Sequence, residues 1–585
     1  MARLKIGSTP FLRMAVALLA MSLFLAGCSG SDSTDAAEEG EVAADDSDEN
    51  DAGEESSADA DADADGDSEG SGDAEETVVT LPAFEPASLD PAVGGTGFQE
   101  YQNLYEPLVD AYAKDGEIRP LAAESWDVSD DGLTYTFHLR EGLKWSDGEP
   151  VTANDFRYAW LRQIDPEVAS YTPDLFFEIQ NAEAYLNGEV TDPDEVGIAV
   201  LDDLTLEVTL AQPAAYWLRV TGTNAYFPVR QDVIEEHGDA WTEPETFVGN
   251  GPYMLDQWVR DQRLEFVQNP HYAGPWADTR LVDRVIYRTF QDPWNEALTP
   301  YEAGEIDAAL IPGPDLERVE ADEDMASNVL RVPLAGGSIM VFDTQSGPTD
   351  DVLVRQAITM ATDFESLAND VLRGAYAHAV SFSPPQMSSH DPDSFPAFDP
   401  EGARALLAEA GYPDGEGFPT LELTTWTLAR ENLISQALAA MWSENLSIDV
   451  SIQSFEPAAM TEWRNTRAEE DFDVYLALQW ADLEDPRFFH VSQLDPAGNV
   501  RHSGYDNPDY VAALDAALSA GDQGSYDAAW REAEALVNRD LPIVTTVYEA
   551  RPWIVSDALS NFQEVTTEVS EMIRVAQPPG LQVSR

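Results

Sequence analysis

The chain has 585 residues, 43% of them hydrophobic, so it is long enough to bury large cores in more than one domain. It carries 110 acidic residues against 31 basic ones, a formal net charge of −79. This balance predicts no nucleic-acid partner, because phosphate binding requires the opposite charge. An acidic surface suits a halophilic setting, where salt screens the repulsion between carboxylates.

Residues 1–27 resemble a lipoprotein signal peptide. Three basic residues precede or flank the start of the apolar run 14–26, which is too short to span a bilayer. Leu25-Ala26-Gly27-Cys28 resembles the lipobox of bacterial lipoproteins, so we expect Cys28 to be the lipidated first residue of the mature chain, held at the membrane. A cysteine that follows an ordinary signal peptide by chance is the alternative. Cys28 is the only cysteine, so the chain can form no internal disulfide.

The segment after Cys28 is predicted to be a disordered acidic linker, at 28–76. Residues 29–76 contain 21 Asp or Glu and no Lys or Arg. Such a segment buries too little apolar surface to offset the entropy of ordering, and repulsion between its carboxylates extends it. The Asp-Ala repeat at 59–65 lacks the spacing of a calcium-binding loop, so no metal site is expected there.

From Thr77 onward the pattern indicates a packed mixed α/β protein. Residues 134–140 alternate apolar and polar side chains, which is typical of a half-buried strand. A turn at 146–148 precedes a helix that Thr152 and Asp155 can cap. The apolar face of this helix carries Phe156, Trp160 and Ile164.

The C-terminal half alternates strands and helices. This order indicates an α/β layered domain, in which a ligand binds beyond the carboxyl ends of the strands. The predicted elements are a helix from Asp399 to Gly411, a strand–helix–strand unit over 420–426, 433–442 and 448–452, a strand at 472–480, helices near 508–518 and 526–537, and a strand at 543–548.

Three runs, at 120–126, 131–140 and 145–156, resemble the signature of the extracellular family 5 solute-binding proteins. These are the oligopeptide- and dipeptide-binding subunits of ABC importers. The resemblance covers essentially all of 77–585. Shorter matching stretches occur in the same order: Leu89-Asp90-Pro91, Asn250-Gly251-Pro252-Tyr253, Asn269-Pro270-His271-Tyr272, Gly304-Glu305-Ile306-Asp307, Val354-Arg355-Gln356-Ala357-Ile358, Ala408-Glu409-Ala410-Gly411-Tyr412 and Trp480-Ala481-Asp482.

The resemblance implies an α/β fold of the periplasmic-binding-protein type, a two-lobed clamp with a hinge and an extra inserted small domain. It implies a monomer that binds a peptide ligand between the lobes and delivers it to ABC transporter permease subunits, in the periplasm or at the outer face of the membrane. A non-peptide solute such as a nickel chelate, haem or a sugar is the alternative, and no cofactor is expected. The expected boundaries are 77–107, 231–333 and 547–585 for lobe I, 108–230 for the inserted domain, and 334–546 for lobe II.

Asp482 is the main candidate for ligand binding. In the oligopeptide branch that the chain resembles, the aspartate of a motif like Trp480-Ala481-Asp482 pairs with the α-amino group of the peptide. A carboxylate that is buried when lobes close needs a cation, and an ammonium group supplies one. A structural aspartate paired with Arg487 is the alternative. Trp480 and Gln479 flank the site as candidate pocket walls, although a tryptophan also serves as plain core.

The other end of the ligand has no assigned anchor. An arginine that some relatives carry aligns with Leu476, and Arg355 and Arg373 are candidates that equally suit surface ion pairs. The turn Gly94-Gly95-Thr96-Gly97 is also a candidate, because backbone groups of Gly95, Thr96 and Gly97 can pair with an extended peptide. A glycine turn with no ligand is the alternative.

Catalysis finds no support in the sequence. The chain has no Gly-x-Ser-x-Gly elbow, no His-Glu-x-x-His pair and no P-loop, and its one cysteine is predicted to be lipidated. The seven histidines include no pair at a helical ligand spacing, so no metal site is expected. An extracellular hydrolase on another fold is the competing class, and cleavage of peptides by the purified protein would reveal it.

Overall fold

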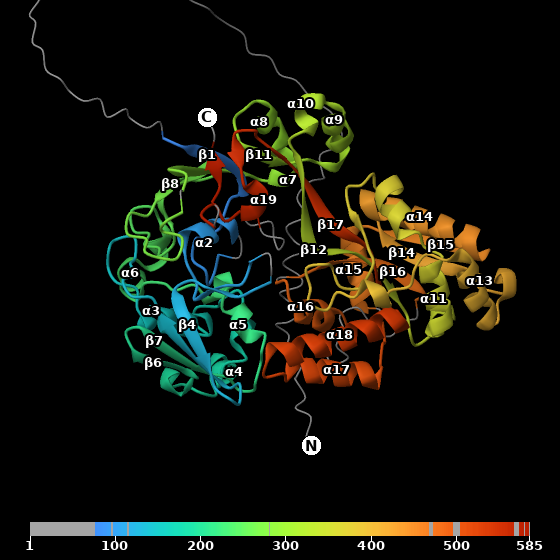
Figure 1. Cartoon of the computed structure of the whole chain (residues 1–585), viewed down its shortest axis with the longest axis horizontal. Helices are drawn as coiled ribbons and strands as arrows, with labels where there is room; N and C mark the ends of the chain where they lie inside the picture. Colours follow the sequence, from blue (N-terminus) through green and yellow to red (C-terminus); the bar gives the residue numbers. More distant parts are fainter. Residues whose placement is uncertain are drawn as a thin grey trace, which may run out of the picture. The chain divides into compact units, whose positions relative to one another are not determined.

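The structure is a computed structural model (Figure 1). The predicted signal peptide, Cys28 and the acidic linker lie outside the residues that it describes. Within the described part, no helix combines the length and the apolar character that a membrane span requires. The described residues are 76–94, 98–113, 116–279, 281–466, 472–481, 483–494, 503–566, 573–577 and 580–583.

A four-stranded sheet, here called the terminal sheet, pairs the first strand of the chain with three later ones in the order β1-β10-β9-β8. β10 lies parallel to β1 and antiparallel to β9. Burial alternates strictly along β10, as expected for a strand with one face on a core. The strands are β1 (Val78–Phe84), β8 (Tyr253–Val259), β9 (Arg263–Gln268) and β10 (Arg284–Phe290).

A second four-stranded sheet, the inserted sheet, is antiparallel throughout with the order β4-β5-β7-β6. It confirms the strand predicted at 134–140 as β5. The helix predicted next is α3 (Ala153–Gln163), and its capping box forms, with the Thr152 backbone N–H donating to Asp155 Oδ2 at 2.7 Å. The strands are β4 (Ala123–Val128), β5 (Thr134–Leu139), β6 (Ile198–Asp202) and β7 (Thr205–Thr209).

A seven-stranded sheet, the large sheet, has the order β11-β17-β12-β16-β14-β15, with β13 paired to β17. The predicted βαβ unit is confirmed, because β14 and β15 are parallel and joined by α14. β15 is an edge strand, and its Ile452 is 39% exposed. The elements are β11 (Ala308–Leu310), β12 (Val329–Phe342), β13 (Ala377–His378), β14 (Leu421–Trp426), α14 (Ala429–Leu446), β15 (Val450–Phe455), β16 (Val474–Trp480) and β17 (Ile543–Val555).

The two longest strands, β12 and β17, pair antiparallel along most of their length and run from β11 to the helices of the large sheet (Figure 1). Their register shifts twice in the middle, between Pro333 and Gly337 and again between Ser338 and Ile339. Pro333 lies opposite Ala550 and Gly337 opposite Tyr548, so three residues of β12 face the single residue Glu549 of β17. An extra-residue bulge of this kind bends the strand that carries it.

β12 buries both of its faces, as a central strand covered on two sides must. Ile339 and Val341 belong to a core that continues through the terminal and inserted sheets. Met340 and Phe342 belong to a second core, which α11 (Val352–Met360), α13 (Pro400–Glu409) and α14 complete. α13 begins as predicted, with Asp399 accepting the backbone N–H of Gly402.

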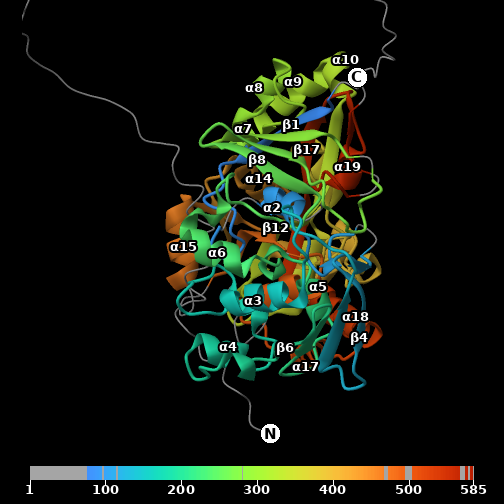
Figure 2. The same cartoon turned by 90° about the vertical axis from the view of Figure 1, so that its left-hand side faces the viewer.

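The helices near the C-terminus form a hairpin, α17 (Pro508–Leu518) followed by α18 (Gln523–Asp540), close to the two helices predicted there. At the other end of the large sheet, α7 and α8 contact β11, and α9 and α10 follow beside them (Figure 2). The other helices are α2 (Phe98–Leu104), α4 (Ala182–Leu186), α5 (Trp217–Val220), α6 (Gln231–His237), α7 (Pro293–Glu296), α8 (Leu298–Glu302), α9 (Leu316–Ala321), α10 (Glu323–Ala326), α12 (Phe364–Ser366), α15 (Pro457–Thr466), α16 (Pro486–Leu494) and α19 (Phe562–Val565); the short strands are β2 (Val109–Asp110), β3 (Arg119–Pro120), β18 (Leu559–Ser560) and β19 (Gln582–Val583).

Candidate ligand-binding site

The Trp-Ala-Asp motif begins where β16 leaves its partner strand. Trp480 pairs with Gly336 of β12, and the backbone N–H of Ala481 donates to the carbonyl of Ala335 at 2.9 Å. Asp482 itself lies outside the described residues, as do Gly95, Thr96 and Gly97. The motif therefore starts beside the bulge in β12, and bulges commonly occur next to binding sites.

The two predicted pocket walls differ in exposure. Trp480 is 38% exposed, whereas Gln479 is 1% exposed, as expected for neighbours on opposite faces of a strand. The Gln479 side chain donates to the backbone carbonyl of Phe489 at 3.1 Å, which ties β16 to α16. Trp480 is thus accessible at the surface, whereas Gln479 is buried and holds β16 against α16.

Three exposed aromatic side chains are linked by one ring contact and by the cation–π contacts of one arginine. We call these three side chains the aromatic cluster. Phe84 at the end of β1, Trp294 in α7 and Trp480 at the end of β16 are 37%, 41% and 38% exposed. Phe84 meets Trp294 edge-on at 5.2 Å between ring centroids. The guanidinium of Arg551 in β17 lies 4.7 Å from the Trp294 ring centroid and 5.6 Å from that of Trp480. Both distances are within the range of cation–π attraction.

A buried ion-pair network holds Arg551 in place. Arg551 Nε lies 3.5 Å from Glu549, the residue opposite the bulge, and Arg430 Nη1 donates to the other oxygen of Glu549 at 2.6 Å. Arg430 Nε donates to Glu431 at 2.7 Å. Burial by itself would lower the pKa of Arg430. The neighbouring carboxylates of Glu549 and Glu431 have the larger effect and raise the Arg430 pKa. The network thus fixes charged side chains directly behind the aromatic cluster.

The candidate anchors Arg355 and Arg373 make structural contacts. Arg355 is buried and donates to the backbone carbonyls of Thr349, Asp350 and Asp540. Arg373 is exposed and pairs with Glu317. These contacts support the structural alternative for both arginines.

Arg487, the alternative partner suggested for Asp482, pairs with the inserted-sheet region, while Asp482 lies outside the described residues. Its Nη2 donates to Glu178 at 3.1 Å, and its guanidinium lies 4.4 Å from the ring centroid of Tyr216. The Tyr216 hydroxyl also donates to Glu178, at 2.6 Å.

Nearby, the Tyr526 hydroxyl donates to the buried Asp485 at 2.5 Å, and burial raises the Asp485 pKa. The segment after Asp482 is therefore fixed to both α18 and the inserted-sheet region.

Several stretches that carry the family resemblance serve the fold. Asp90 accepts two hydrogen bonds from the guanidinium of Arg162, at 2.8 and 2.5 Å. Asn250 exchanges two hydrogen bonds with the backbone of Glu106, both at 2.9 Å. Asp307 accepts the backbone N–H of Thr80 at 2.7 Å and so holds β1.

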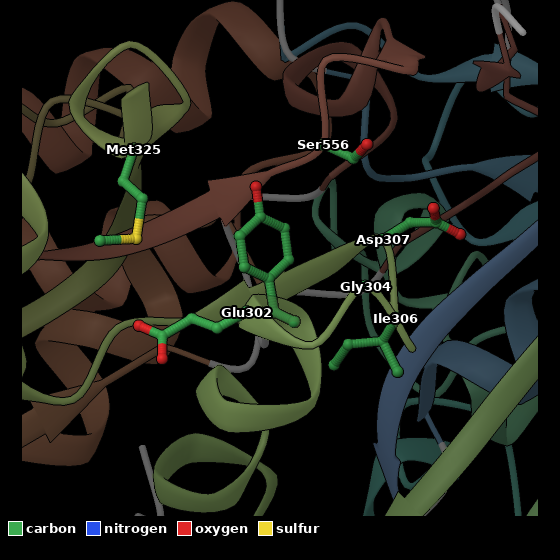
Figure 3. A pocket seen from close by; sticks show the side chains of 7 residues that line it. Glu302, Gly304, Ile306, Asp307, Met325 and Ser556 are labelled. Carbon is green, nitrogen blue, oxygen red and sulfur yellow. The ribbon is translucent and has the colours of Figure 1, made fainter. Parts of the chain in front are cut away.

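A cavity of about 380 Å³ adjoins the last of these stretches (Figure 3). The carboxylates of Glu302 and Asp307 point to opposite sides of it, so they do not converge on a common ligand (Figure 3). Glu302 pairs with Arg318, and Asp307 pairs with the backbone of β1. The lining residues are Tyr301, Glu302, Gly304, Ile306, Asp307, Met325 and Ser556.

Comparison with known proteins identifies the family. Residues 117–500 match the bacterial extracellular solute-binding proteins, family 5 (middle part). The periplasmic murein peptide-binding protein MppA of Escherichia coli K12 is 33% identical over 504 residues, which cover 82% of this chain and 90% of that protein. The periplasmic oligopeptide-binding protein OppA of Salmonella typhimurium is 30% identical over 501 residues, or 82% of this chain and 89% of that protein.

The fold agrees with the sequence comparison. The solved structure of MppA in its unliganded open form matches with a TM-score of 0.76 at 30% identity, covering 87% of this chain and 98% of that one. The fold is thus that of an extracytoplasmic, two-lobed solute-binding protein of the periplasmic type, which confirms the predicted fold class. The chain belongs to the bacterial extracellular solute-binding proteins of family 5, a family of binding proteins.

Proposed function

We propose that the protein captures oligopeptides or dipeptides between its two lobes and delivers them to the permease subunits of an ABC importer. The observation that carries this proposal is the exposed Trp480, which begins the Trp-Ala-Asp motif beside the bulge in β12. Asp482 follows Trp480 by two positions in the chain, so we expect a ligand that covers Trp480 to contact it as well. A carboxylate at that position suits an ammonium group, which every unmodified peptide carries.

The irregular pairing of β12 and β17 supports the proposed lobe boundaries. Lobe I and lobe II meet at residues 333 and 547 in this proposal, and the register of β12 and β17 breaks at the same level. A bulge offers a place where two paired strands can bend while their remaining pairs persist. Closure of the lobes over a ligand is then a shift of population toward a form in which the ligand makes contacts from both sides.

The identity of the bound solute tests the proposed function directly. Protein purified without refolding is expected to retain ligand, and native mass spectrometry should show a ladder of short-peptide masses. Incubation with free peptides should yield no cleavage products, because the protein binds and releases them intact. A single non-peptide mass, or hydrolysis of the added peptides, would contradict the proposal.

The membrane anchor is part of the proposal and has its own test. Cys28→Ser should move the protein from the membrane fraction to the soluble fraction, because it removes the only thiol that a lipid could modify. Peptide affinity should not change, since the acidic linker separates Cys28 from the folded body. Ser29→Ala, beside the cysteine, serves as the matched control and should stay in the membrane fraction. An unchanged distribution of Cys28→Ser would refute the lipid anchor.

A further inference from the structure

We infer that the aromatic cluster is a subsite for one neutral aromatic side chain of the ligand, so that the protein prefers peptides with Phe, Tyr or Trp at one position. This inference rests on the proposed function and extends it to ligand preference. Five aromatic side chains of the described residues are strongly exposed, and Phe84, Trp294 and Trp480 are connected through one ring contact and through Arg551. Exposed apolar surface that gathers in one place is typical of a binding site.

The orientation of Trp480 is built into the backbone. A Cβ atom at Gly336 would lie 2.8 Å from the Trp480 ring and 2.5 Å from the backbone carbonyl of Gln479. Only glycine therefore allows the indole to lie against β12 at this point. A Trp480 ring that already lies against β12 loses little conformational entropy when a ligand stacks on it.

The charge of Arg551 determines which planar side chains of a ligand can stack on the cluster. Arg551 already places a guanidinium against both indoles, and the network through Glu549 and Arg430 fixes its position. A lysine or arginine side chain of the ligand would meet this positive charge and be disfavoured. A neutral ring can stack on the exposed indole surface without that repulsion. The chemistry therefore favours a neutral aromatic side chain over a basic one.

The cluster also draws on both proposed lobes. Phe84 and Trp294 belong to segments assigned to lobe I, whereas Trp480 belongs to lobe II. A ligand ring that stacks on Trp480 and reaches Trp294 would contact both proposed lobes at once. The binding energy of this ring then stabilises the closed form more than the open form. A ligand shifts the open–closed equilibrium only if it binds one form more tightly than the other.

A peptide series with leucine variants tests the inference. Calorimetry would compare Ala-Ala-Ala with tripeptides that carry one Phe at each position in turn. We expect wild-type protein to bind one of the Phe peptides about tenfold more tightly than Ala-Ala-Ala. In Trp294→Leu and Trp480→Leu, which keep apolar bulk but remove the indole, this ratio should fall to about twofold, because the Phe peptide loses more affinity than Ala-Ala-Ala does. Phe398→Leu, at an exposed aromatic outside the cluster, is the matched control and should keep the wild-type ratio.

The outcomes separate this inference from the proposed function. Wild-type protein that binds all the tripeptides equally well would overturn the aromatic subsite but leave peptide capture standing. A wild-type ratio in both tryptophan variants would also overturn it. Failure of the wild type to bind any peptide would contradict the proposed function and, with it, the subsite. If a leucine variant fails to fold, Trp294→Met and Trp480→Met replace it, and an unchanged preference for the Phe peptide in both counts against the cluster.

Discussion

Replacement of Glu534 by alanine is expected to lower the free energy of unfolding by about 3 to 5 kcal/mol. Glu534 is fully buried in α18, where Oε2 lies 2.9 Å from His490 Nε2 and accepts the Ser383 hydroxyl at 2.6 Å. Its other oxygen accepts the Ser383 backbone N–H at 2.8 Å. Alanine would leave a buried imidazole and a buried hydroxyl without this partner. Denaturant unfolding at neutral pH measures the loss.

The effect should depend on pH. Burial acts to raise the Glu534 pKa, but the hydrogen bond and charge of His490, together with Ser381 and Ser383, outweigh it and lower the pKa below 4.5. A carboxylate whose pKa is lower in the folded state stabilises the protein above its unfolded pKa, and this contribution is lost as the pH falls through the folded pKa. The difference between wild type and Glu534→Gln should therefore be larger at pH 7 than at acidic pH.

A neighbour on the same helix supplies the control. Glu532 lies two residues before Glu534 and is exposed, so Glu532→Ala should change the free energy of unfolding by no more than about 0.5 kcal/mol. A loss of less than about 1 kcal/mol for Glu534→Ala would mean that the pair with His490 contributes little to stability.

Asp482→Asn is expected to weaken binding of a cognate peptide by about 2 to 5 kcal/mol if, as proposed, Asp482 pairs with the α-ammonium of the ligand, because the change would leave that ammonium buried without a counter-charge. N-acetylation of the peptide should weaken binding to the wild type by a similar amount. The two changes should not add, since either one removes the same ion pair. A double-mutant cycle by calorimetry measures this coupling.

Asp506→Asn, at an exposed aspartate, is the matched control and should bind the free and acetylated peptides as the wild type does. Equal affinity of Asp482→Asn and wild type would remove Asp482 from the site. If the acetylated peptide also bound as well as the free one, the amino terminus of the ligand would have no role in recognition.

Local patterns predicted local structure well. The capping box at Thr152 and Asp155 and the parallel pair β14 and β15 formed as their periodicity indicated, because the interactions involved lie within a few turns or a single βαβ unit. The same pattern could not place β15 at the edge of the sheet, where Ile452 is exposed. Strand order depends on contacts between distant segments, which periodicity does not encode.

The candidate site was predicted only in part. The family resemblance led to Trp480 and Asp482, but the neighbours of Trp480 come from segments that no motif connects. Trp294 precedes it by almost two hundred residues, and Arg551 follows on the last long strand. Arg487 was considered as a partner for Asp482 because it is near in sequence, and the structure adds a partner that no local pattern predicts, Glu178, 309 positions away. Each of these contacts results from tertiary packing.

The bulge in β12 lies at the same level as the residues that a ligand would touch. Three residues of β12 face Glu549, and Glu549 contacts Arg551 behind the two indoles. The pairing of β12 and β17 is irregular at two steps here, and dihedral changes during a hinge motion concentrate where pairing is incomplete. The dissociation rate of a ligand would then depend on the stiffness of this part of β12. A change in that stiffness would alter the rate of ligand exchange without altering the affinity for the ligand.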